Sequence, residues 1–218
     1  MLKSYRLPYP NRSVAGRALA GELMAYADRA DTVILALPRG GAPVAAEVAR
    51  ILRLPWDVFL VRKVGVPGYE ELAMGAIASG GVRVMNDEIV TQLGLPETTV
   101  ARAISRAADV IAEREHAYRG DRPVLDVRGQ TVILVDDGLA TGATMRAAVR
   151  ALRQQGAGRL VVAVPVAAPE VCDALRAEVD EVVCAATPDP FEAVGWWYED
   201  FSQTSDDEVR ALLADARH

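Results

Sequence analysis

Short apolar runs rich in Val, Ile and Leu recur along the chain, separated by longer segments of helical period. The runs lack polar alternation, which is typical of strands buried on both faces. We therefore predict a strand at each of them. The runs are TVILALP (32–38), DVFLVR (57–62), VRVMN (82–86), TVILVDD (131–137), RLVVAVPV (159–166) and EVVCAAT (181–187).

The segments between these runs predict helices. Residues 42–53 and 144–155 repeat apolar side chains at the spacing of one helix face, and a longer pattern of the same kind runs from 97 to 118. Each of these patterns predicts an amphipathic helix that packs against the strands.

The two ends of the chain also predict helices. The first spans 13–29, with Ser13 as its N-cap. The last spans 205–216, where Ser205 and Glu208 have the spacing of a capping box. Neither helix carries a visible catalytic motif.

Strands that alternate with helices predict a fold of the α/β class. Such βαβ units build a mainly parallel sheet with helices on both faces. We find no internal repeat, low-complexity tract or linker that would divide the chain, so we predict a single domain over residues 1–218.

One long stretch, RKVGVPGYEELAMGAIASGG (62–81), resists assignment because glycine and proline interrupt it. A segment of this length inside a compact domain is usually a lid, a binding loop or a mobile hairpin. The pattern leaves these three alternatives open.

Composition predicts a self-sufficient globular protein. The chain has 218 residues, 51% of them hydrophobic and 25% charged, with a formal net charge of −6. A chain of this length can bury a sizeable core, and the near balance of charges argues against disorder. The acidic balance argues against nucleic acid as a partner. It does not exclude a small polyanionic ligand, because one pocket can be locally positive.

The sequence predicts a cytoplasmic protein with no membrane partner. Its start lacks the apolar core of a signal peptide, and no stretch approaches the roughly 18 apolar residues of a membrane span. Two cysteines, Cys172 and Cys184, lie in apolar surroundings. We predict that both are reduced, buried thiols.

Several common catalytic motifs are missing. There is no P-loop, no dinucleotide fingerprint, no G-x-S-x-G elbow and no C-x-x-C pair. The two histidines are His116, in a charged helical run, and His218, the last residue, and both are predicted to be solvated. We expect chemistry that needs neither a histidine base nor a cysteine nucleophile.

The strongest signal is TVILVDDGLATGATM, residues 131–145. A buried strand brings Asp136 and Asp137 to its carboxyl end, where ligands of open α/β sheets bind. The small residues that follow, with the Thr141 and Thr144 hydroxyls, predict a cradle of backbone N–H groups at a helix N-terminus. Two carboxylates beside a phosphate cradle suit a sugar diol, since each can accept a hydroxyl proton.

The segment VILVDDGLATGAT (132–144) resembles the phosphoribosylpyrophosphate motif of the type I phosphoribosyltransferases. The resemblance extends to LPRGG (38–42), which is similar to the family's pyrophosphate loop, where an uncommon cis peptide often exposes backbone N–H groups. Arg62 and Lys63 resemble the basic pair that opens the flexible catalytic loop, here 62–81. VGWWYEDF (194–201) resembles, more weakly, the base-covering element of the purine-type enzymes, which predicts a small C-terminal hood over 188–204.

The resemblance implies a role for each matching residue. The catalytic positions it implies are Arg62, Lys63, Asp136 and Asp137. The substrate-binding positions it implies are Arg39, Gly40, Gly41, Gly138, Ala140, Thr141, Gly142, Ala143, Thr144, Trp196 and Trp197. For the two tryptophans, core or interface packing is favoured over a base-stacking role.

The implied reaction moves phosphoribosyl from phosphoribosylpyrophosphate to a nitrogenous acceptor, with release of pyrophosphate. Mg²⁺ would arrive with the diphosphate, and the resemblance names no protein ligand for it. Ala140 stands where the 6-oxopurine members carry an acidic residue, which disfavours hypoxanthine or guanine as the acceptor. A homodimer is the family expectation.

Two alternatives come from other classes. The first is a regulator that binds phosphoribosylpyrophosphate or a nucleotide without turnover, as some family members do. The second is a metal-dependent phosphohydrolase, which is disfavoured because no further His or Asp cluster supplies metal ligands. The basic pair Arg62-Lys63 favours turnover over regulation.

Overall fold

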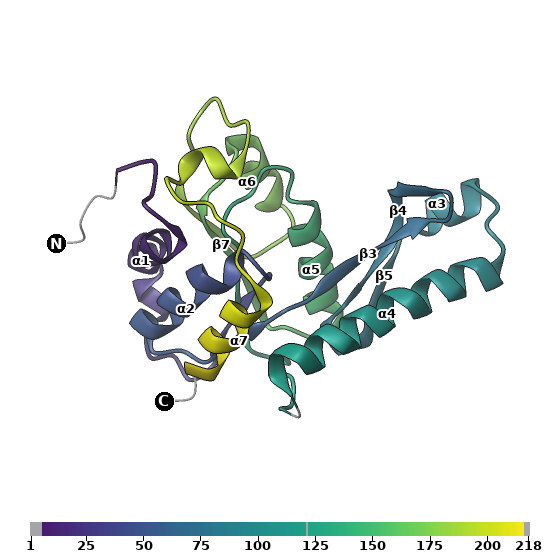
Figure 1. Cartoon of the computed structure of the whole chain (residues 1–218), viewed down its shortest axis with the longest axis horizontal. Helices are drawn as coiled ribbons and strands as arrows, with labels where there is room; N and C mark the ends of the chain where they lie inside the picture. The colour runs from purple at the N-terminus through teal and green to yellow at the C-terminus, as the bar shows by residue number, and fades with distance from the viewer. Residues whose placement is uncertain (1–5, 121, 216–218) are drawn as a thin grey trace.

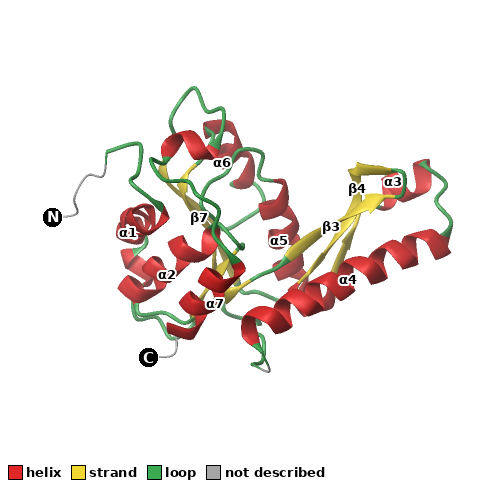
Figure 2. Cartoon of the chain, in the orientation of Figure 1, coloured by secondary structure: helices red, strands yellow, loops and turns green. Residues whose placement is uncertain are grey.

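A computed structural model describes residues 6–120 and 122–215 of the chain. Its centre is a five-stranded, fully parallel sheet with the strand order β2-β1-β6-β7-β8 (Figure 2). The strands are β1 (Thr32–Ala36), β2 (Trp56–Val58), β6 (Thr131–Val135), β7 (Arg159–Val166) and β8 (Glu181–Ala186). The predicted fold class, an α/β domain with a mainly parallel sheet, is confirmed.

Side chains of the central strands are buried on both faces of the sheet. In β6, Ile133 and Val135 pack into one hydrophobic cluster, whereas Val132 and Leu134 pack into the cluster on the other face. Because successive side chains of a strand point to opposite faces, a strand buried on both sides reads as one apolar run. This is why the sequence pattern shows no polar alternation here.

Helices cover both faces of this sheet (Figure 2). On one face lie α1 (Arg12–Glu22), α2 (Gly41–Leu52) and α7 (Asp206–Asp215). On the other face lie α5 (Ala143–Gln154) and α6 (Pro169–Leu175). The predicted helix positions at 42–53 and 144–155 each differ from α2 and α5 by one residue.

A second, antiparallel sheet forms an arm that projects from the body at the right of Figure 1. It contains β3 (Val61–Val66), β4 (Tyr69–Ala78) and β5 (Val82–Met85) in that order. Two helices complete the arm, α3 (Asp87–Gln92) and α4 (Glu97–Arg119).

The arm corrects two strand predictions. The run at 57–62 is divided between β2 and β3, and the run at 82–86 lies in the antiparallel sheet rather than in the parallel one. The reason is the connection, because only the short turn η2 (Ser79–Gly81) joins β4 to β5. A parallel neighbour would need a crossover of a dozen or more residues.

A buried ion pair ties the arm to the body. Arg119, the last residue of α4, donates from Nε to Asp57 Oδ2 of β2 at 2.7 Å. Arg119 also bonds to the Val58 carbonyl and to Glu115. Burial raises the pKa of Asp57, and the Arg119 charge opposes this rise. Arg119 therefore supplies the compensation that a buried carboxylate needs.

The terminal helices differ in how well the sequence predicts them. Asn11, not Ser13, caps α1, since its side chain accepts from the Val14 amide at 3.0 Å. This helix also ends earlier than predicted, at Glu22, and a short 3₁₀ turn, η1 (Met24–Tyr26), follows. At α7 the capping box of Ser205 and Glu208 is confirmed, with bonds of 2.6 and 3.1 Å.

The prediction that both cysteines are reduced thiols is wrong in this structure. Cys172 of α6 and Cys184 of β8 form a disulfide. The alternation along β8 turns Cys184 toward the face that α6 covers, into the hydrophobic cluster that contains Cys172. Their apolar surroundings were predicted, but a sequence pattern does not show that a helix and the adjoining strand bring the two sulfurs together.

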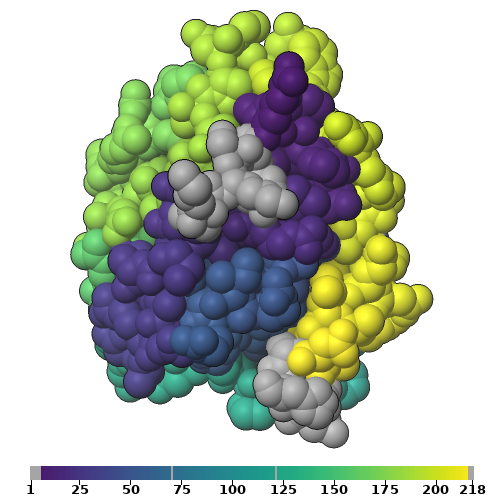
Figure 3. Space-filling view, turned by 90° about the vertical axis from the view of Figure 1, so that its left-hand side faces the viewer, coloured from purple at the N-terminus to yellow at the C-terminus, as the bar shows by residue number. Residues whose placement is uncertain are grey.

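The first and last parts of the chain lie side by side. Tyr9 pairs with Tyr198 in a parallel bridge, and the Tyr9 amide donates to the Trp197 carbonyl at 2.8 Å. Figure 3 shows the purple N-terminal segment against the yellow C-terminal one. The 3₁₀ turn η3 (Val194–Trp197) lies within this contact region.

Two further predictions concern exposure. His116 is exposed, as predicted, and His218 lies outside the described residues. Across the described ranges, no helix combines the length and apolar character that a membrane crossing requires.

Candidate functional site

The two motif loops meet at a topological switch point of the parallel sheet. β1 and β6 are neighbours, but α2 leaves β1 toward one face and α5 leaves β6 toward the other. Helices that diverge in this way open a crevice at the carboxyl ends of the two strands, where open α/β sheets bind ligands. The predicted pyrophosphate loop and the predicted phosphate cradle therefore border the same crevice.

The two helices that begin at this crevice lack the side-chain groups that often stabilise a helix N-terminus. Neither α2 nor α5 has a side-chain cap, and neither carries an acidic residue in its first turn. By contrast, Asn86 caps α3 and Ser205 caps α7. The positive end of the helix dipole at α2 and α5 suits an anion. Free N–H groups add to this at the start of α5, whereas at α2 the Gly41 and Ala42 amides donate to the Leu37 and Arg39 carbonyls.

The loop after β6 presents an open cradle at the start of α5. Gly142 is the N-cap residue and has a φ of 69°, which favours glycine. The loop is held from behind, because the Leu139 amide donates to the Val166 carbonyl at 3.0 Å and the Ala168 amide donates to Leu139 at 3.0 Å. The cradle side chains Ala140, Thr141, Ala143 and Thr144 are all exposed.

Asp136 and Asp137 lie against the start of α2. The Asp136 carboxylate accepts from the Asp137 amide at 2.8 Å. A Cβ atom at Gly40 would overlap Asp137 Oδ2, and one at Gly41 would lie 3.3 Å from Asp136 Oδ1. Only glycine at position 40 therefore lets the predicted pyrophosphate loop approach the Asp137 carboxylate. The peptide between Pro38 and Arg39 in this loop is cis.

The two carboxyl groups share one electrostatic environment. Burial, and secondarily the negative charge of Asp137, raise the pKa of Asp136 well above its ordinary value. Burial also raises the pKa of Asp137, but the Arg12 guanidinium opposes this rise. Donors that bond to the ionised carboxylates would lower both pKa values, so the pair is suited to bind hydroxyl groups.

The C-terminal segment covers the same loop. Tyr198 donates from its hydroxyl to the Asp137 carbonyl at 2.6 Å. A Cβ atom at Gly138 would lie 2.5 Å from Val194 Cγ1, so η3 packs directly on the loop. The predicted hood segment therefore lies beside the two aspartates.

The two tryptophans of this segment differ in their surroundings. Trp196 is 63% exposed. Trp197 is half-buried, stacks on Phe191 at 6.1 Å between ring centroids, and packs with Tyr9 and Tyr198. Its packing corresponds to the core alternative, while a stacking role for Trp196 stays a prediction.

The predicted cations lie in two places. Arg39 is half-buried in the loop after β1, beside Gly40. Arg62 and Lys63 are exposed neighbours in β3, so their side chains leave opposite faces of the arm's sheet. Among the described residues none of the three forms an ion pair or side-chain hydrogen bond. Within the described ranges, no hydrogen bond or ion pair joins Arg62 or Lys63 to Asp136 or Asp137.

A comparison with known families identifies the fold. The profile of the phosphoribosyl transferase domain matches residues 7–197, which includes the crevice, the cradle and most of the hood. The chain belongs to this family.

Relatives of this phosphoribosyl transferase domain agree with the assignment. A Mycobacterium tuberculosis protein with the provisional name phosphoribosyl transferase is 44% identical over 205 residues, covering 94% of this chain but 46% of its own length. The chain therefore spans about half of that relative. The crystal structure of TT1426 from Thermus thermophilus matches with a TM-score of 0.84 at 42% identity, covering 96% of this chain and 99% of that one.

A further match covers a shorter part of the chain. The ribose-phosphate pyrophosphokinase of Methanopyrus kandleri is 46% identical over 74 residues, which is 32% of this chain and 25% of that protein.

Three residues at the site of this phosphoribosyl transferase domain were not predicted from sequence. They are Arg12, Val194 and Tyr198. Arg12 donates from Nε to Asp137 Oδ2 at 2.8 Å, although 125 positions separate the two residues. Val194 and Tyr198 stand within the predicted hood motif, VGWWYEDF (194–201), which is the one signal that could have indicated them. Nothing in the local pattern around Arg12 reveals its partner.

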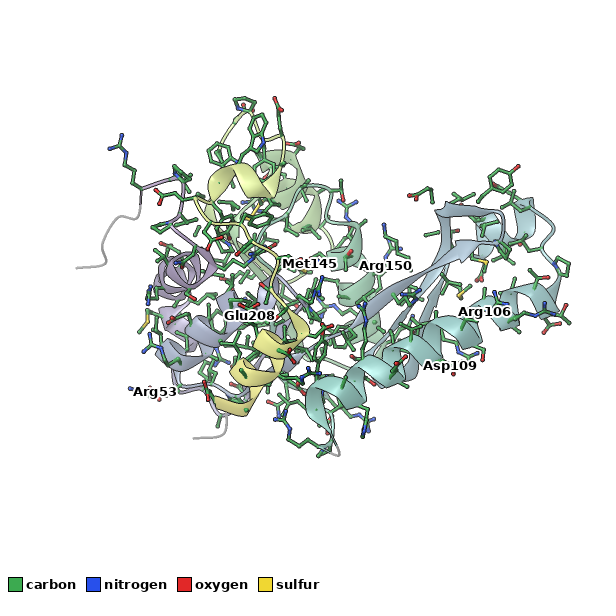
Figure 4. All side chains as sticks on the ribbon, viewed as in Figure 1. Arg53, Arg106, Asp109, Met145, Arg150 and Glu208 are labelled. Carbon is green, nitrogen blue, oxygen red and sulfur yellow. A yellow bond between two sulfur atoms is a disulfide. The ribbon has the colours of Figure 1, made fainter. Side chains whose placement is uncertain are left out.

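Two further observations concern metal binding and a cavity outside this crevice. Across the described ranges, no group of three or more His, Cys, Asp or Glu side chains is placed to share a metal ion. A cavity of about 600 Å³ lies between α2, Leu54–Trp56 and α7. Arg53, which lines it, is far from Met145 in the first turn of α5 (Figure 4).

Proposed function

We propose that this domain transfers phosphoribosyl from phosphoribosylpyrophosphate to a nitrogenous acceptor, with release of pyrophosphate. One observation carries the proposal: two uncapped helix N-termini and two adjacent carboxylates border a single crevice at the switch point of the sheet. A phosphorylated sugar that carries a diphosphate needs both anion sites with the diol site between them. Membership in the phosphoribosyl transferase domain family supports the same reading.

The chain's residues would bind the donor in three parts. The amides of Ala140 to Thr144 would hold the 5′-phosphate, and Asp136 with Asp137 would accept the ribose hydroxyl protons. The pyrophosphate would lie against Gly40, Gly41 and the cation of Arg39.

The reaction requires no enzyme nucleophile. A nitrogen of the acceptor forms a bond to ribose C1 while the bond from C1 to the pyrophosphate oxygen breaks, with inversion at C1. The electron pair of the broken bond leaves with pyrophosphate, and the proton that the attacking nitrogen loses passes to water. Arg39, and Arg62 and Lys63 if the arm approaches, would stabilise the negative charge that develops on the leaving group. Closure of the hairpin β3–β4 would exclude water, which would otherwise attack the activated sugar.

Mg²⁺ would arrive as part of the substrate. A divalent ion on the diphosphate is held largely by substrate oxygens and water, as this ion prefers. Because the described residues bring no cluster of three metal-binding side chains together, a substrate-borne ion suits the donor set of this crevice. It would neutralise the diphosphate and make it a better leaving group.

The acceptor is proposed to be a nucleobase other than hypoxanthine or guanine. Ala140, which is exposed in the cradle, offers no carboxylate to handle a purine proton. A homodimer, a cytoplasmic location and a place in nucleotide metabolism stay predictions.

The test is a panel of purines, pyrimidines and other amines, each mixed with phosphoribosylpyrophosphate and Mg²⁺ while pyrophosphate release is followed. We expect release with at least one nitrogenous acceptor, and none when the acceptor or the protein is omitted. Tight binding of phosphoribosylpyrophosphate without release from any acceptor would contradict turnover and favour the alternative, a non-catalytic sensor of phosphoribosylpyrophosphate or a nucleotide.

The assignment of the site is tested by binding alone. Asp137→Asn and Thr141→Ala should each weaken phosphoribosylpyrophosphate binding, by about tenfold for the loss of a hydrogen bond to a charged group. Calorimetric titration in the presence of Mg²⁺ measures this change. Unaltered affinity in both variants would show that the donor binds elsewhere.

A further inference from the structure

Arg12 is the first residue of α1, and its side chain is largely buried at the crevice. Only 11% of it is exposed, and its Nε donates to Asp137 Oδ2 at 2.8 Å. The capping of α1 does not require this arginine, since Asn11 caps the helix. Its contacts therefore need another explanation.

The rest of the guanidinium contacts the C-terminal segment. Nη1 donates to the Ser202 carbonyl at 2.7 Å. The Cζ atom lies 4.0 Å from the centroid of the Phe201 ring, a cation–π distance. One planar group therefore joins Asp137 to residues 201–202, and Tyr198 adds a second link from the same segment to the Asp137 carbonyl.

We propose that Arg12 is a positioning residue for the donor sugar. It holds the Asp137 carboxylate ionised and oriented toward the ribose hydroxyls, and it couples that carboxylate to the hood residues Phe201 and Ser202. This inference rests on the proposed function, because it assigns Arg12 to the same donor site. An ionised carboxylate has four acceptor positions, so Asp137 can keep Arg12 and still accept a hydroxyl.

The charged and polar groups that face Asp137 determine the direction in which its pKa should change when Arg12 is removed. Asp136, on the same loop, adds negative charge; Tyr198, from the hood, bonds to the Asp137 backbone carbonyl; Arg12, from α1, supplies the opposing positive charge. Removing Arg12 should raise the pKa of Asp137 further. A larger fraction of the carboxyl is then protonated at a given pH, and binding that needs the ionised form requires a higher pH.

The experiment compares Arg12→Met, Arg12→Lys and the control Arg17→Met by calorimetric titration with phosphoribosylpyrophosphate and Mg²⁺ over a pH series. Arg17 lies on the same helix, is 41% exposed and pairs with Glu47, away from the crevice. We expect Arg12→Met to bind about tenfold or more weakly, with its pH midpoint of binding moved upward. Arg12→Lys should keep the midpoint but bind more weakly, since an ammonium cannot form both planar contacts. Arg17→Met should match the wild type.

Each outcome decides between the two proposals. A wild-type protein that does not bind the donor overturns the proposed function itself. A wild type that binds, together with a folded Arg12→Met variant of unchanged affinity and midpoint, overturns only the role of Arg12. If Arg12→Met does not fold, Arg12→Lys decides: an affinity equal to that of the wild type contradicts the coupling to the hood, and an upward shift of its midpoint contradicts the role of the charge.

Discussion

At the scale of single residues, close approach and charge define the crevice. Gly40 lets Asp137 lie against the loop after β1, since any side chain would overlap the carboxylate. Arg12 meets the same carboxylate from α1. Three segments that are distant in the chain therefore converge on one oxygen atom, Asp137 Oδ2.

The pair of Arg119 and Asp57 allows a test of stability at the residue scale. Arg119→Met leaves Asp57 buried without its cation, and we expect the free energy of unfolding to fall by about 3–5 kcal/mol. Denaturant unfolding measures this loss. The double variant Arg119→Met with Asp57→Leu should recover most of it, because no buried charge remains.

The pH dependence of the same variant has a definite sign. Burial raises the pKa of Asp57, and loss of Arg119 removes the main opposing charge. A carboxyl whose pKa is raised by folding stabilises the protein below its ordinary pKa, and this contribution is lost as the pH rises through the folded value. The deficit of Arg119→Met should therefore be larger at about pH 8 than at about pH 5. An equal deficit at both pH values would contradict the role assigned to Asp57.

Site residues could be predicted from the sequence where they lie close to one another along the chain. The aspartates, the glycines and the threonines of 136–144 lie within one strand–loop–helix unit, so their spacing alone places them together. Arg12 and Tyr198 reach Asp137 only through tertiary packing, across 125 and 61 positions of the chain. No local pattern encodes such contacts.

At the scale of elements, buried strands and amphipathic helices were predictable because each has its own period. The arm was not, since its sheet packs against α4 and, near the body, against α5, and it carries glycines that break the alternation. For residues 62–81 the sequence left a lid, a binding loop and a mobile hairpin open. The structure shows a hairpin, β3–β4, in this segment. Whether it closes over substrate stays a prediction.

The disulfide between α6 and β8 leads to a testable prediction at the scale of elements. Protein purified without reductant and then denatured should show no reactive thiol, and reduction should release both. Closing so short a loop is expected to contribute about 3 kcal/mol to the free energy of unfolding. The Cys172→Ser, Cys184→Ser double variant should be insensitive to reductant. Two reactive thiols before reduction would support the prediction made from sequence instead.

At the scale of the whole molecule, the protein and its proposed ligand both carry negative charge. The chain carries a formal charge of −6, yet two helix N-termini without acidic residues border the crevice, and Arg39 lies in the loop that leads into α2. Global charge governs long-range steering and solubility, whereas backbone amides and helix dipoles act within a few ångströms. An acidic protein can therefore bind a small polyphosphorylated sugar.

The central claim is that the crevice between β1 and β6 binds phosphoribosylpyrophosphate. The most direct test is a crystal structure of the protein with this ligand and Mg²⁺. We expect the 5′-phosphate on the amides of 140–144, the ribose hydroxyls on Asp136 and Asp137, and the diphosphate beside Gly40 and Gly41. A ligand bound elsewhere, or one in this crevice with its ribose turned away from both aspartates, would contradict the claim.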